Sequence, residues 1–162
     1  MEAVDFDDYC AARGRALVRL AYALTGDFHQ AEDLVQAALM RCYGRWSKIN
    51  DHNSYVRRVI VRIYVRSSRR RIEEPMAQVP DRVDVANQGG SDDGAIAYAL
   101  LASLPPRQRA VLVLRYLEDL PDEIIAQQLK ISVGTVKSQA ARALGKLRTS
   151  PILATLTQWE SP

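Results

Sequence analysis

The chain has 162 residues, of which 48% are hydrophobic and 25% are charged, and its formal net charge is +3. This length accommodates one ordinary domain or two small ones, and the apolar content is sufficient for a buried core. No run of about 18 apolar residues occurs, so a membrane-spanning helix is not expected.

The N-terminus and the two cysteines indicate the cellular compartment of the protein. The first ten residues, MEAVDFDDYC, are acidic and do not resemble a secretory signal. Cys10 and Cys42 are far apart and neither belongs to a C-x-x-C motif, so we expect no zinc site and no disulfide framework. A reduced, cytoplasmic protein is therefore predicted.

The charge is distributed unevenly along the chain. Residues 1–72 carry 13 Lys and Arg against 8 Asp and Glu, residues 73–95 carry 1 against 6, and residues 96–162 carry 8 against 5. Two basic blocks on either side of an acidic connector indicate a polyanionic partner that is contacted at two places.

Helical periodicity recurs through the chain and the alternation typical of strands is missing, so we predict an all-α protein. A first helix is expected over 6–24, with a break at Thr25-Gly26-Asp27, and a second over 30–45. Their predicted inward residues are Leu17, Leu20, Ala21 and Leu24, then Ala31, Leu34, Val35, Ala38, Leu39 and Cys42. A short polar loop over 49–54 follows.

A third helix, predicted over 55–71, carries a stripe of arginines. Its members are Arg58, Arg62, Arg66, Arg69 and Arg70, and the opposite side, expected in the core, has Val56, Val59, Ile60 and Ile63. Tyr55 and Tyr64 are expected to add aromatic surface. Arginines in a row neutralise phosphates, and aromatic rings beside them stack on exposed bases. Between Lys48 and Glu73 the only acid is Asp51, whereas an ordinary solvated face mixes signs.

Residues 73–94 are predicted to form a flexible linker, because they contain two prolines, three glycines and six acids. A second helical unit is expected from residue 95, with helices over 99–104 and 107–117 separated by Pro105-Pro106. The tail from residue 149 has the pattern of a short helix through Ile152, Leu153 and Leu156.

Residues 121–148 read as a helix-turn-helix. Ile124, Ile125 and Leu129 give its first helix an apolar side, and Ser132 is a good N-cap for the second. The second helix has one apolar face, formed by Val136, Ala140, Ala143, Leu144 and Leu147. Its other face carries Thr135, Ser138, Gln139, Arg142 and Lys146. These groups hydrogen-bond base edges or pair with phosphates, which indicates a reader of double-stranded DNA.

Signals for catalysis are weak. His29 and His52 are isolated, Asp92-Asp93 lies in the predicted linker, and neither a phosphate-binding glycine loop nor a nucleophile-plus-base motif occurs. We therefore expect a binding protein without a cofactor rather than an enzyme.

Three segments together resemble the extracytoplasmic-function (ECF) sigma factors, and their sequences are most similar to the SigE-like subgroup. They are AEDLVQAAL, the basic helix YVRRVIVRIYVRSSRRR, and LPPRQRAVLVLRYLEDLPDEIIAQQLKISVGTVKSQAARALGKLR. The resemblance covers about residues 6–148. It implies a sigma region 2-like domain over 1–72, a linker over 73–94, a region 4-like helix-turn-helix domain over 95–150 and a tail over 151–162.

The resemblance also implies partners and sites. The first domain would dock on the clamp coiled coil of core RNA polymerase and would recognise and open the −10 element. The second would bind the −35 element and the polymerase flap, and an anti-sigma factor is a further candidate partner. The implied core-binding residues are Asp33 and Gln36, and those for −10 DNA are Asn50, Asp51, His52, Asn53, Arg58, Arg62 and Arg66. The implied −35 residues are Ser132, Thr135, Lys137, Ser138, Gln139, Arg142 and Lys146. No membrane insertion is expected, and the location would be the cytoplasm, at the nucleoid.

Two departures from the family pattern bear on specificity. Gln139 stands where relatives often have arginine, and Ser67-Ser68 stand where relatives often have aromatics. Glutamine prefers adenine edges where arginine prefers guanine, so the −35 preference is expected to differ.

Two other functions compete with this interpretation. A free-standing helix-turn-helix regulator would bind a palindrome as a dimer without polymerase. A nucleic-acid-modifying enzyme on a basic helical scaffold would turn over DNA by itself, but the missing ligand and nucleophile motifs count against it.

Overall fold

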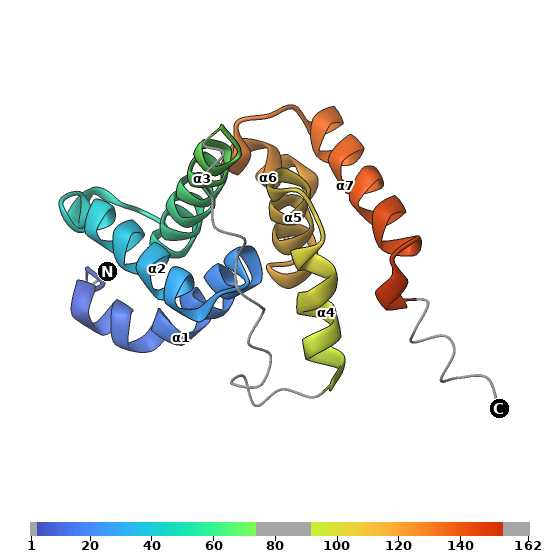
Figure 1. Ribbon diagram of the computed structural model, residues 1–162. Coiled ribbons are helices and arrows are strands. Elements are labelled where there is room, and N and C mark those ends of the chain that lie inside the picture. Colours follow the sequence, from blue (N-terminus) through green and yellow to red (C-terminus); the bar gives the residue numbers. More distant parts are fainter. Residues whose placement is uncertain (1–2, 74–91, 154–162) are drawn as a thin grey trace. The chain divides into compact units, whose positions relative to one another are not determined.

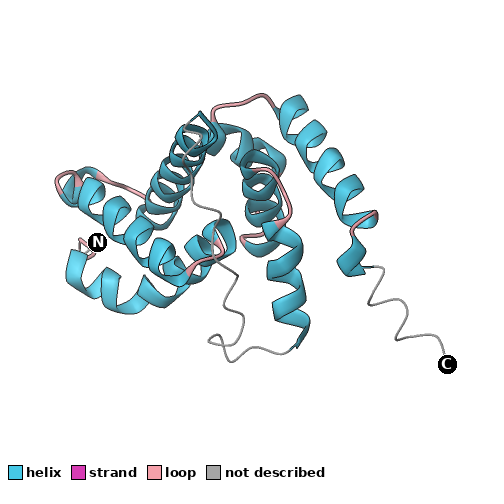
Figure 2. Cartoon of the chain, viewed as in Figure 1, coloured by secondary structure: helices cyan, strands magenta, loops and turns pink. Residues whose placement is uncertain are grey.

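The computed structural model describes residues 3–73 and 92–153 (Figure 1). Within those residues all regular structure is helical and no strand occurs, which confirms the predicted all-α class (Figure 2). The chain divides into two compact units, residues 1–77 and 78–162. No helix of the described part is both long and apolar enough to cross a membrane.

The first unit contains α1 (Phe6–Thr25), α2 (Phe28–Tyr43), the short 3₁₀ helix η1 (Trp46–Lys48) and α3 (His52–Glu73). The helices α1, α2 and α3 all pack against one another. Gly26 ends α1 as predicted, with φ 71°, a left-handed conformation that favours glycine. Asp27 then caps α2, because its Oδ1 accepts from the Gln30 amide at 2.9 Å.

The core of this unit follows the predicted periodicity in α1 and α2. All the predicted inward residues of both helices are buried except Leu39, which is half-buried. An aromatic group, formed by Phe6, Tyr9 and Trp46, packs together in this unit. The Trp46 ring contacts those of Phe6 and Tyr9 edge to face, with centroid distances of 5.0 and 4.9 Å. The Trp46 indole also donates to the Val4 carbonyl at 2.7 Å, which ties the N-terminus to η1.

The inward face of α3 differs from the prediction. Val56 and Ile60 are buried as expected, but Val59 and Ile63 are only half-buried. Val61 and Tyr64 are buried in their place. The prediction of Tyr64 as aromatic surface was therefore wrong. The reason is that α3 packs against both α1 and α2, so its buried side is broader than a single stripe.

The second unit contains α4 (Asp92–Ala102), α5 (Pro106–Leu112), the π-helical segment η3 (Val113–Leu117), α6 (Asp122–Leu129) and α7 (Val133–Arg148). The break at Pro105-Pro106 is confirmed, with Pro106 as the first residue of α5. The helix predicted over 107–117 is not uniform, because its last five residues form the wider π turn. The helices α5 and α6 both pack on α7.

The boundaries of the predicted linker need correction. Glu73 belongs to α3, and residues 92–94 belong to α4, so both ends of the 73–94 segment are helical. Residues 74–91, which carry the rest of that prediction, lie outside the described part of the chain. The tail prediction is described only to residue 153, where 151–153 are helical.

Candidate nucleic-acid interface

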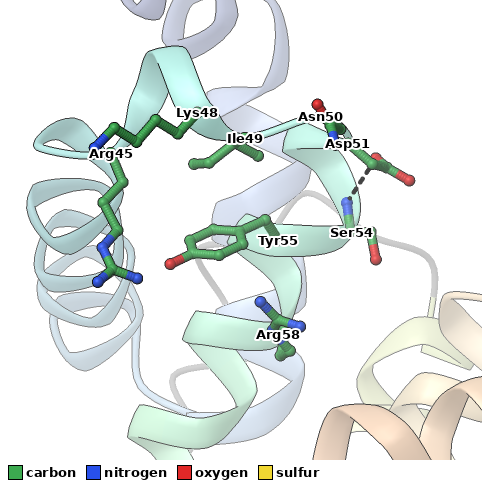
Figure 3. A pocket seen from close by; sticks show the side chains of 8 residues that line it. All are labelled: Arg45, Lys48, Ile49, Asn50, Asp51, Ser54, Tyr55 and Arg58. Carbon is green, nitrogen blue, oxygen red and sulfur yellow. Dashed lines mark hydrogen bonds between the residues drawn. The ribbon is translucent and has the colours of Figure 1, made fainter.

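An open cavity of about 400 Å³ lies where η1 and the loop after it meet the start of α3 (Figure 3). Its lining residues are Arg45, Lys48, Ile49, Asn50, Asp51, Ser54, Tyr55 and Arg58. The Tyr55 ring extends across the cavity between the side chains of Arg45 and Arg58 (Figure 3). The Arg58 guanidinium carbon is 4.8 Å from the Tyr55 ring centroid, within cation–π range. The cavity therefore combines a flat aromatic surface with positive charge.

The four predicted loop residues separate in the structure. Asn50 and Asp51 line the cavity, and Asn53 is exposed outside it. His52 instead turns to the aromatic group: its ring centroid is 4.1 Å from that of Trp46, and its Nε2 is 3.1 Å from the Trp46 carbonyl oxygen. His52 therefore serves local packing, and the structure does not bring it together with the cavity.

Asp51 caps α3. Its Oδ1 accepts from the Ser54 amide at 3.1 Å, and its carbonyl accepts from the Tyr55 amide at 3.0 Å. This is N-cap geometry, which satisfies donors that the first turn of a helix leaves free. A carboxylate that is held this way fixes the first turn of α3, on which Tyr55 lies.

Replacing Asp51 separates the capping role from a role of its charge. Asp51→Ala is expected to lower the free energy of unfolding by about 1 kcal/mol, whereas Asp51→Asn retains the cap and changes it by a few tenths at most. Urea unfolding followed by circular dichroism measures both. Equal losses in the two variants would contradict the capping role.

Sequence reasoning missed Arg45 and Lys48. Both are exposed side chains that border the cavity from the α2–α3 connection. The available signal was their placement on either side of Trp46, a buried anchor that holds this short segment in place. The backbone of a basic residue next to a buried aromatic side chain is fixed by that side chain. The backbone of a lysine in a loop without such an anchor is not fixed in this way.

The arginine stripe of α3 is present, and its side chains become more exposed toward the C-terminal end of the helix. Arg58 and Arg62 are half-buried, whereas Arg66, Arg69 and Arg70 are exposed. Burial lowers the pKa of Arg62, and the nearby positive charge of Arg58 lowers it further, with a smaller opposing effect of Tyr55. The helix therefore carries a row of guanidinium groups from the cavity outward along α3.

The α2 face carries the second predicted contact surface. Asp33 and Gln36 are both exposed. Gln36 borders an open cavity of about 450 Å³ whose other lining residues are Phe6, Cys10, Leu39, Met40 and Tyr43. Met40 is 78% exposed and Tyr43 is 66% exposed, which is unusual for large apolar side chains. Gln36 thus lies beside an uncovered apolar surface, and Asp33 is exposed one turn earlier on α2.

The helix-turn-helix prediction is confirmed in its local geometry. Lys130 ends α6 in the left-handed region with φ 55°, and Ser132 caps α7, its Oγ accepting from the Thr135 amide at 3.1 Å. Arg115 pairs with Asp122 at 2.8 Å, which joins η3 to the start of α6. These contacts fix the start of α6 against η3 and the first turn of α7.

The outer face of α7 is mostly as predicted. Lys137, Ser138, Arg142 and Lys146 are exposed, and Thr135 and Gln139 are half-buried. The Ser138 hydroxyl donates to the Gly134 carbonyl at 2.9 Å, so its oxygen is left as an acceptor. Ser132 is exposed but its Oγ is engaged with Thr135, so it acts as a cap in the free protein.

The chain is similar to known families and proteins over both units. Family models of sigma-70 region 2 and sigma-70 region 4 match residues 11–72 and 95–147. The RNA polymerase sigma-E factor of Streptomyces avermitilis is 41% identical over 153 residues, covering 91% of this chain and 85% of that protein. The namesake of Streptomyces coelicolor is 40% identical over 153 residues, with 91% and 86% covered.

Two solved structures share the fold. One is the sigma factor RpoE in complex with the anti-sigma factor NepR from Bartonella quintana, with a TM-score of 0.72, 21% identity and 93% of this chain and 97% of that chain covered. The other is CnrH in complex with the cytosolic domain of CnrY, with a TM-score of 0.63, 19% identity and 96% and 89% covered.

Proposed function

The chain belongs to the sigma-70 family of RNA polymerase sigma factors, and from that premise we propose how its two helical units divide promoter recognition. A sigma factor binds core polymerase and directs promoter recognition and opening, while catalysis belongs to the polymerase. In this proposal the first unit opens the −10 element, and the second reads the −35 element and docks on the polymerase flap.

The cavity around Tyr55 is the observation that carries the assignment of the first unit. Promoter opening needs a base to leave the stack, which costs a few kcal/mol, and a pocket that holds the base offsets that cost. The Tyr55 ring supplies a stacking surface, and Arg45, Lys48 and Arg58 place positive charge where the sugar-phosphate backbone would pass. Asn50 adds an amide that can hydrogen-bond a base edge.

The exposed arginines of α3 extend this surface along the promoter. Arg66→Ala is expected to weaken open-complex formation and to reduce the slope of log K against log salt by about one, since one phosphate contact is lost. A salt series of open-complex yields measures the slope. Arg19→Ala removes an arginine of α1 that is also exposed and is the matched control, for which the parental slope is expected. An unchanged slope for Arg66→Ala would exclude Arg66 from the DNA contact.

The exposed face of α2 is proposed to bind the polymerase clamp. Asp33→Ala combined with Gln36→Ala is expected to weaken binding to core polymerase without change in helicity, because both side chains are exposed. Titration of labelled protein with core polymerase measures this. Arg15→Ala, an exposed change on α1, is the control, and parental affinity of the double variant would overturn the assignment.

The second unit is proposed to read DNA through the outer face of α7. Its N-terminal half carries Thr135, Ser138 and Gln139, which suit base edges, and its C-terminal half carries Arg142 and Lys146, which suit phosphate. A cytoplasmic location at the nucleoid and control by an anti-sigma factor are further parts of this proposal.

Transcription in vitro with core polymerase over genomic fragments tests the proposed function as a whole. We expect start sites that require both this chain and core polymerase, each preceded by a shared pair of elements. A free-standing regulator would instead bind its sites in the absence of polymerase. Specific footprints without core polymerase, together with no start sites in its presence, would favour the regulator.

A further inference from the structure

The cavity around Tyr55 has two walls, which come from different segments of the first unit. Arg45 and Lys48 lie on either side of Trp46, in and directly before η1. Tyr55 and Arg58 belong to α3 (Figure 3). A stacking ring and a phosphate-binding cation act on different parts of one nucleotide, so the distance between the walls decides whether a nucleotide fits. A residue that ties η1 to the start of α3 therefore sets the width of the cavity.

His52, the first residue of α3, makes such a tie. Its Nε2 lies 3.1 Å from the Trp46 carbonyl oxygen, and the same oxygen accepts from the Ile49 amide at 3.2 Å. A carbonyl oxygen only accepts, so this hydrogen bond needs the proton on Nε2 of the imidazole. The His52 ring also packs on the Trp46 ring, with centroids 4.1 Å apart and planes tilted by 34°. His52 thus joins η1 to α3 through a hydrogen bond and a ring contact.

Trp46 is a fixed point for this tie. Its side chain is only 9% exposed, and its indole N–H donates to the Val4 carbonyl at 2.7 Å. Phe6 and Tyr9 contact its ring edge to face. Because close-packed side chains that are held on several sides move little, loss of the contact with His52 would displace the start of α3 rather than Trp46.

The tie acts close to the stacking ring, since Tyr55 lies one turn after His52 on α3. Residues three positions apart are neighbours on the surface of a helix. A small tilt of the first turn would therefore move Tyr55 relative to Arg45 and Lys48. In sites that depend on exact placement, an error of about 1 Å can cost about 100-fold in rate.

We propose that His52 is a positioning residue for promoter opening, and that its hydrogen bond to Trp46 sets the width of the Tyr55 cavity. At that width a flipped nucleotide stacks on Tyr55 while Arg45 and Lys48 reach its phosphate. This inference rests on the proposed function of the first unit. In this role His52 acts through Trp46 and α3 rather than by contact with the DNA.

Three substitutions of His52 separate its hydrogen bond from its ring. Glutamine carries an N–H donor the same number of bonds from Cα as Nε2, methionine has that length without a donor, and phenylalanine has a ring without a donor. With polymerase holoenzyme on promoter DNA, we expect opening near the parental level for His52→Gln. For His52→Met and His52→Phe we expect a loss of about fivefold, which corresponds to one hydrogen bond of ordinary strength. His29→Gln, which changes the other histidine, an exposed residue of α2, is the control with parental opening.

A positioning role acts through Tyr55, whereas a folding defect does not. His52→Met should therefore cost nothing further in the Tyr55→Leu background, and its binding to core polymerase should be parental. Additive losses in the double variant, equal losses in His52→Gln and His52→Met, or parental opening in His52→Met would each overturn the proposal. Parental opening in Tyr55→Leu would instead overturn the stacking role of the cavity, and this proposal with it.

The tautomer of His52 provides a second measurement, which needs no variant of His52 and stays decisive if those variants perturb the fold. Long-range proton–nitrogen NMR of the full chain, under conditions where the imidazole is neutral, distinguishes the two tautomers. The chain has two histidines, so His29→Gln assigns the resonances of His52. We expect the proton on Nε2. A proton on Nδ1 would leave the Trp46 carbonyl without this donor and would overturn the proposal.

Discussion

Replacing Tyr55 by leucine is expected to reduce open-complex formation more than any other single change in the first unit. Stacking of a base on an aromatic side chain is worth about 1–3 kcal/mol, which corresponds to roughly a five- to 150-fold loss in the opening equilibrium. Leucine retains an apolar side chain of good helix propensity but offers no ring. Because Tyr55 is half-buried at the start of α3, the fold should be retained.

Tyr55→Phe is the matched control. Phenylalanine retains the ring face and the site over which Arg58 is placed, so opening should stay near the parental level. Potassium permanganate footprinting of melted thymines measures opening, and thermal unfolding of each variant measures folding. Parental opening in Tyr55→Leu would exclude the ring as the stacking surface. Equal losses in both variants would point to the hydroxyl instead.

Replacing Gln139 by arginine is expected to change which −35 base is preferred. A side chain that reads a base edge contributes roughly 1–3 kcal/mol of discrimination, and arginine favours guanine where glutamine favours adenine. Gln139 is half-buried on α7, two turns after the Ser132 cap, so its position on the helix is well defined. A selection over randomised −35 sequences, carried out with polymerase holoenzyme, reads out the preferred base.

Lys146→Ala is the control within the same helix. Lys146 is exposed two turns further along, and a phosphate contact there would lower affinity evenly across sequences. The selected motif should therefore be the parental one, at weaker overall binding. If Gln139→Arg returned the parental motif too, the outer face of α7 would not be the reading surface.

Local features of the fold could be predicted well from the sequence. Gly26 ends α1, Ser132 caps α7, and the apolar residues of α1 and α2 that repeat at helical spacing form the core. These features depend on interactions between residues three or four positions apart, which a linear pattern records directly. Tyr55 and Arg58 of the proposed promoter surface were also identified from their positions on α3, whereas Arg45 of the same surface was not.

Tertiary packing decided the rest. Tyr64 and Val61 are buried because α3 packs against both α1 and α2. The periodicity of a single helix does not show how many other helices it contacts. His52 was expected in the loop beside the DNA, but its ring packs on that of Trp46, six residues earlier. Arg45 and Lys48 border the same cavity as Tyr55 although they precede α3 in the chain. The π turn that exposes Tyr116 and Leu117 likewise has no propensity signal. Each of these outcomes depends on which surfaces meet, and that is set by three-dimensional complementarity rather than by local spacing.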